Sequence, residues 1–117
     1  MASFSKLKLS NSTDGKLIKV TETSSPGTLI HTAIAGTSDY DEIWIYAMNQ
    51  GTTDNALIIE WGGTANPDDR ITVTLLPKAG LALVIPGLVL QNEKNIRAFA
   101  STANLILIGG YVNRIYE

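Results

Sequence analysis

The chain of 117 residues contains no cysteine and only one histidine, His31. The absence of cysteine excludes a disulfide framework and any metal site built from thiolates. A single imidazole also argues against most transition-metal sites, which need several nitrogen or sulfur ligands. No Ser-His-Asp or Cys-His pattern accompanies His31, so we interpret it as a strand histidine held by hydrogen bonds.

Charged residues are scarce as well, at 17% of the chain with a net charge of −2. In soluble domains about a quarter of the residues are usually charged. The slightly negative net charge argues against a nucleic-acid-binding surface. Sparse charge predicts a surface partly covered by subunit contacts, or alternatively a small and highly buried sandwich. Residues 1–27 carry +2 and the remainder −4, which favours attraction between identical subunits unless the asymmetry is chance.

Long hydrophobic runs are missing too. The longest, residues 81–90, is interrupted by Pro86 and Gly87, whereas a membrane helix needs about 18 apolar residues. Residues 1–20 lack the apolar stretch of a signal peptide. We therefore expect neither a membrane span nor a secretory leader.

Short apolar segments separated by turn signals are what the sequence does contain. Residues 71–75 alternate apolar and polar side chains, which is typical of a strand with one wet face. No segment repeats with the period of a helix. Seven or eight strands at regular spacing predict an all-β, antiparallel β-sandwich, which we expect to be jelly-roll-like because the cysteines of an immunoglobulin domain are absent. The expected strands are residues 28–35, 41–49, 56–61, 70–76, 81–85, 88–90, 95–100 and 105–113.

Three details of these strands are also predicted. Leu81, Leu83 and Ile85 are expected to share one buried side. Residues 95–100 and 105–113 look like a closing hairpin. Gly109-Gly110, inside the last strand, indicates a bulge or a close backbone approach.

The chain divides, on this interpretation, into an N-terminal arm (residues 1–27) and a β-sandwich body (residues 28–117). The arm is rich in Ser, Thr and Lys, and it alternates polar and apolar residues near its start. Such a segment can add as a strand to a neighbouring sheet edge. The alternative is a flexible tail. The arm residues predicted to bind a partner are Phe4, Lys6, Leu7, Lys8 and Leu9.

Acidic residues offer the remaining candidates for chemistry. Asp39, Asp41 and Glu42 precede the strongest strand, and such a group can bind Ca²⁺, but solvated turn acids are the expected case. A glycosidase needs two carboxylates across a cleft, and Asp41, Glu60 and Asp68 are candidates for them, although nothing in their spacing requires it. We expect no enzyme activity, no catalytic residue, no metal site and no cofactor.

Aromatic side chains are the other potential binding groups. Exposed aromatics on a sandwich can stack on sugar rings, but tryptophan and tyrosine more often pack in cores and interfaces. Whether the side chains of Trp44 and Trp61 are exposed or packed distinguishes the two cases. The residues predicted to lie at subunit contacts are Tyr46, Trp61, Phe99 and Tyr111.

The order of several segments resembles small structural proteins of tailed bacteriophages. These segments are TLIHTAIAGTSDYDEIWIYAMN, ALIIEWGG, the PDD of residues 67–69, and GLALVIPGLVLQNEKNIRAFASTANLILIGGYVNRI. The likeness covers residues 28–115 and is to virion proteins of the capsid decoration, or cement, type. It implies a non-enzymatic homotrimer that binds the major capsid protein on the capsid exterior. Such a protein is made in the host cytoplasm and binds no nucleic acid, membrane or small-molecule substrate.

Two alternatives remain from the sequence. One is a carbohydrate-binding β-sandwich module of a phage fibre. The other keeps the virion role but places the protein in the neck or tail.

Overall fold

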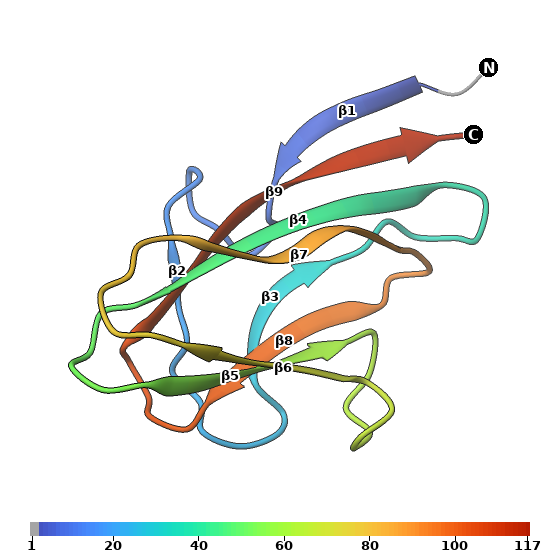
Figure 1. The fold of residues 1–117 in the computed structure, drawn as a ribbon. Helices are drawn as coiled ribbons and strands as arrows, with labels where there is room; N and C mark the ends of the chain where they lie inside the picture. The colour runs from blue at the N-terminus through green and yellow to red at the C-terminus, as the bar shows by residue number, and fades with distance from the viewer. Residues whose placement is uncertain (1–2) are drawn as a thin grey trace.

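The structure is a computed structural model, and it describes residues 3–117. These residues contain nine β-strands (Figure 1). No helix occurs in these residues, so the all-β prediction is confirmed. The strands are β1 (Ser3–Lys8), β2 (Ile18–Lys19), β3 (Thr28–Thr32), β4 (Tyr40–Asn49), β5 (Asn55–Trp61), β6 (Arg70–Leu75), β7 (Ala82–Leu90), β8 (Asn95–Ala100) and β9 (Ile106–Tyr116).

Two antiparallel sheets pack face to face. One has the order β1-β9-β4-β7, with β2 also paired to β9, and the other has the order β3-β8-β5-β6. From β2 to β9 the chain crosses between the sheets at every connection except the β5–β6 hairpin. This order is that of a jelly roll, so the predicted sandwich topology is confirmed.

The predicted closing hairpin is wrong. β8 and β9 belong to different sheets, and the turn at residues 101–104 crosses from one layer to the other. Turn residues mark where a chain reverses, but they do not determine whether the next strand pairs with the previous one or packs over it.

The core lies between the sheets and follows the alternation of the strands. Every second residue of β4, from Asp41 to Asn49, is buried. Ile71 and Val73 of β6 pack against the core and Leu75 is buried, as predicted. Burial of these alternating aliphatic side chains is the main favourable contribution to the fold.

The predicted shared side of Leu81, Leu83 and Ile85 is wrong. Ile85 is buried, but Leu81 is 54% exposed and Leu83 is 47% exposed. The register of β7 against β4 shifts by one residue between Ile85 and Leu83. An inserted residue of this kind reverses the side on which later side chains emerge. Pro86 does not end β7, because an edge strand tolerates a missing N–H.

The N-terminal segment lies on the sandwich of its own chain. β1 pairs with residues 111–116 of β9, and β2 pairs with residues 107–108 of the same edge. In Figure 1 the blue β1 runs beside the red end of β9. Leu9 and Val20, between and after these strands, are buried in the core. The expected boundary at residue 27 is therefore not a boundary of the hydrophobic core.

Candidate functional site

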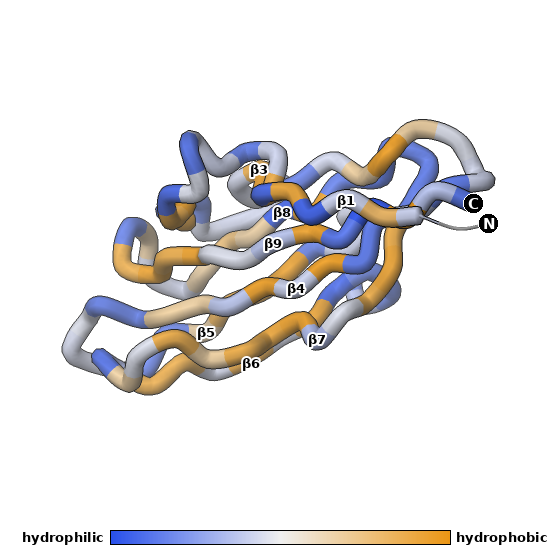
Figure 2. The backbone as a smooth tube through the Cα atoms, turned by 90° about the horizontal axis from the view of Figure 1, so that it is seen from above, coloured by the Kyte–Doolittle hydropathy of each residue, from blue (hydrophilic) through white to orange (hydrophobic). Residues whose placement is uncertain are grey.

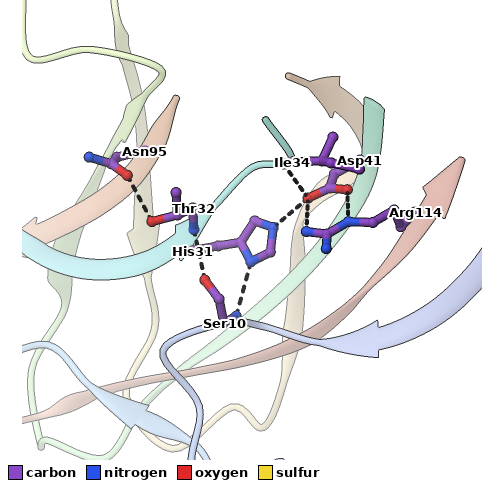
Figure 3. A network of polar contacts seen from close by, with 7 residues as sticks. All are labelled: Ser10, His31, Thr32, Ile34, Asp41, Asn95 and Arg114. Atoms are coloured by element: carbon purple, nitrogen blue, oxygen red, sulfur yellow. Dashed lines mark hydrogen bonds and ion pairs between the residues drawn. The ribbon is translucent and has the colours of Figure 1, made fainter. Parts of the chain in front are cut away.

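A buried polar network joins the two sheets near one end of the sandwich (Figure 3). His31 of β3 lies 2.8 Å, from Nε2 to Oδ2, from Asp41 of β4. Arg114 of β9 contacts the same carboxylate with Nε at 2.8 Å and Nη2 at 3.0 Å. His31 comes from the four-stranded sheet, whereas Asp41 and Arg114 are cross-strand partners in the other. The network therefore holds the layers together at this end.

The proton positions of His31 follow from its neighbours. The backbone N–H of Ser10 donates to Nδ1 over 3.0 Å, so Nδ1 carries no proton. Nε2 then bears the single proton and donates it to Asp41. His31 is thus a neutral imidazole, and the burial of its ring lowers its pKa below 6.5 despite the nearby carboxylate. The prediction that His31 is a hydrogen-bonded strand histidine is confirmed.

Asp41 is ionised inside the protein. Burial alone raises a carboxyl pKa, but the hydrogen bonds from Arg114 and His31 outweigh it and lower the pKa of Asp41 below 3.8. The backbone N–H of Ile34 donates to the same carboxylate over 3.3 Å. Asp41 is fully buried, so the expectation that it is a solvated turn acid is wrong. A turn acid next to a strand becomes buried when a cation from a distant strand neutralises it.

The other two acids of this group point elsewhere. Asp39 accepts from the backbone N–H of Glu117. Glu42 accepts from Asn113 and Trp44, and these two hydrogen bonds lower its pKa. Among residues 3–117, no three His, Cys, Asp or Glu side chains are grouped to hold a metal ion.

The His31 network lacks the geometry of a hydrolytic triad. Both nitrogens of His31 are already hydrogen-bonded, and the hydroxyl of Ser10 accepts from the backbone N–H of Thr32 over 2.8 Å. The imidazole is 1% exposed, so no substrate reaches it. What the arrangement can do is fix three strands and the segment after β1 in one geometry.

Glu60 of β5 is the second buried carboxylate. It accepts from the backbone N–H of Gly27 at 2.8 Å and from the hydroxyl of Ser25. Arg97 donates to the carbonyl of Gly27. Glu60 therefore anchors the 25–27 loop over the four-stranded sheet. It is fully buried while Asp68 is exposed, so these acids do not face one another across a cleft.

A row of stacked side chains crosses the outer face of the five-stranded sheet. The rings of Trp44 and Tyr111 are stacked with centroids 6.1 Å apart and planes inclined by 11°. Lys6 Nζ lies 4.4 Å from the centroid of Tyr111. Gly87 lies against the Trp44 ring, where an added Cβ would stand 2.9 Å from it. The ring faces are therefore largely occupied by protein neighbours.

The predicted contact residues do not form one surface. Tyr46 and Tyr111 lie half-buried on the outer face of the five-stranded sheet, whereas Trp61 packs against the core. Phe99 is 8% exposed, and the guanidinium of Arg70 lies 5.1 Å from its ring centroid. In the N-terminal segment Phe4 is 68% exposed and Leu9 is buried. There Lys6 and Lys8 are exposed and Leu7 is half-buried.

Exposed apolar side chains gather on β7, which the sequence analysis placed largely in the core. Leu88 and Val89 on β7 are 43% and 54% exposed, in addition to Leu81 and Leu83. No charged residue occurs between Lys78 and Glu93. The absence of charge along this segment is the sequence signal that accompanies this apolar surface.

Comparison with protein-family models, curated proteins and solved structures gives no match. Residues 3–117 contain no helix that is long and apolar enough to cross a membrane.

Proposed function

We propose that the chain is a non-enzymatic structural protein of a tailed-phage virion, which binds and stabilises the capsid shell from outside as a decoration, or cement, protein. The proposal takes its class from the resemblance of residues 28–115. The structural observation that carries it is β7, a strand at a sheet edge with exposed leucine and valine side chains and no charge. An apolar surface of this kind is typical of a protein-protein contact.

The rest of the molecule supports an assembly role. The buried carboxylate of Asp41 is bonded to the buried His31 and to the half-buried Arg114, and the buried Glu60 is bonded to a loop. These groups stiffen the sandwich, which lets a contact surface keep its shape when it docks. Self-association, as a homotrimer, belongs to the same proposal and is measured by sedimentation of the purified protein.

The carbohydrate-binding alternative is disfavoured by the two tryptophans. Trp44 is stacked on Tyr111 and against Gly87, and Trp61 packs on the core from the other sheet. A sugar platform needs aromatic faces open to solvent on one surface. The two indoles do not provide one.

The test is binding to bare capsid shells, measured by co-sedimentation. Leu83→Asp and Leu88→Asp, combined in one variant, place two charges on β7 and should abolish binding. Leu17→Asp is the matched control, because Leu17 is 42% exposed away from β7. Full binding by the folded double variant contradicts the role of β7. Imaging of labelled protein on complete particles separates a capsid position from a neck or tail position.

A further inference from the structure

β6 has a sheet edge that no strand among residues 3–117 covers. The backbone N–H of Trp61 donates to the carbonyl of Asp69, and the β5–β6 register continues from this pair without a shift. Because bonded pairs alternate along an antiparallel ladder, Ile71, Val73 and Leu75 bond to β5. Thr72 and Thr74 therefore direct their N–H and C=O groups outward.

The other three sheet edges are each protected. β3 is covered by the segment after β1: Asn11 donates from its backbone to Ile30 and from its side chain to Leu29, and Ser10 accepts from Thr32. β7 contains Pro86 and two register shifts. β1 carries lysines at two of its six positions. Proline, bulges and lysine are known means of blocking edge-to-edge pairing.

β6 has none of these features. β6 contains no lysine, no proline and no bulge, and its one charged residue, Arg70, is its first. Leu76, directly after the strand, is 61% exposed. A hollow of about 200 Å³ opens between β6 and the start of β7 and is lined by Val73, Leu76 and Leu83 among others. β7 carries a long hydrophobic stretch, orange in Figure 2.

We propose that β6 pairs antiparallel with β6 of a second copy of this chain, about a twofold axis at Val73. This register places Thr72 opposite Thr74 of the second copy, and both residues have free main-chain groups. Each such pair exchanges two hydrogen bonds. Ile71 falls opposite Leu75, so apolar side chains meet on the core side of a continuous eight-stranded sheet, formed from two sheets of four.

Charge supports antiparallel contact with a second copy. Asp68 lies in the turn before β6 and Lys78 in the turn after it, and both side chains are exposed. Antiparallel pairing brings the turn that holds Lys78 of one copy toward the turn that holds Asp68 of the other, whereas parallel pairing would bring like charges together. A second copy is therefore the occupant that the edge fits, because its own sequence supplies the complementary charges.

The contact concerns two copies of the chain only, and it stands whether or not the protein binds a capsid. It is also compatible with a trimer, since a twofold edge contact then joins copies from two trimers.

Disulfide trapping tests the pairing and its register together, since the chain has no cysteine of its own. A central pair without mutual hydrogen bonds has Cα atoms about 4.5 Å apart, within the range of a disulfide. Val73→Cys should give a covalent dimer under mild oxidation. Ile71→Cys, which faces Leu75 in the second copy, is the control and should give little. Equal trapping of the two variants, or none with Val73→Cys, overturns the proposal.

A charge exchange gives an independent measurement. Asp68→Lys and Lys78→Asp should each weaken the pairing by about tenfold in sedimentation equilibrium. The double variant should restore it, because each contact again has one charge of each sign. Lys19→Asp, on exposed β2, should leave it unchanged. A wild-type protein that shows no even-numbered association at high concentration, or a double variant no better than the single ones, contradicts the proposed contact.

Discussion

The imidazole of His31 donates its only proton to the carboxylate of Asp41, 2.8 Å away, and both side chains are shut off from solvent. Each belongs to a different sheet. The pair thus links the two layers through a hydrogen bond that requires a neutral imidazole and an ionised carboxylate. Its contribution to stability consequently depends on pH.

Acid should destabilise the protein from about neutral pH downward. The pKa of His31 is lowered in the fold from 6.5, so below that pH the unfolded chain binds the extra proton and the native state resists it. Stability is fully present above pH 6.5 and falls until the pH passes the lowered pKa. Asp41, whose pKa is lowered from 3.8, adds a second loss of the same sign at lower pH. Urea midpoints measured from pH 8 to about pH 2 check both losses, and His31→Gln should remove the upper part of the slope.

In the ion pair of Asp41 and Arg114, removing the cation should lower the free energy of unfolding more than removing the anion. Arg114→Met leaves the carboxylate of Asp41 buried without its counter-ion, and we expect a loss of about 3–5 kcal/mol. Asp41→Asn leaves a guanidinium that is 23% exposed and reaches water, so about 2–3 kcal/mol is expected. Asp54→Asn, on the exposed turn before β5, is the control and should change stability by less than about 0.5 kcal/mol. A loss below about 1 kcal/mol for Arg114→Met would mean that the pair is dispensable.

The two adjacent glycines of β9 should respond very differently to alanine. A Cβ on Gly110 would stand 2.0 Å from the backbone oxygen of Trp44, which cannot move without disturbing β4. We expect Gly110→Ala to cost about 3 kcal/mol or more. A Cβ on Gly109 would meet only the end of the flexible Leu17 side chain, so Gly109→Ala should cost less than about 1 kcal/mol. Equal thermal midpoints of the two variants would contradict this reading of the close approach.

Two N-terminal truncations should show that β1 contributes little to the stability of the core, whereas the segment after β1 contributes much. Removing residues 1–8 takes away a strand whose only partly buried residue is Leu7, so the truncated chain should keep a cooperative unfolding transition. Removing residues 1–20 also deletes Leu9 and Val20 from the core. Core truncations of this size cost about 2–5 kcal/mol each, which approaches the whole stability of a small domain. The shorter deletion is therefore the one that tests whether β1 attaches the protein to a shell.

The sequence by itself determined the class of structure. Apolar alternation in residues 71–75, the β-branched and aromatic run from Ile43 to Tyr46, and frequent turn residues predicted an all-β sandwich. The pair Gly109-Gly110 indicated the close approach that Gly110 makes. These signals are local, because side-chain period and turn preference depend on the backbone of the residues that carry them.

Only the tertiary structure decided which strands pair and which charges meet. Arg114 and Asp41 are 73 residues apart, and no spacing in the sequence links them to each other or to His31. The one-residue shift in β7, which exposes Leu83, likewise depends on the register against β4. Pairing and register are set by hydrogen bonds and packing between distant segments. A strand's own alternation is therefore the same whether it lies in one sheet, in the other, or at an open edge such as that of β6.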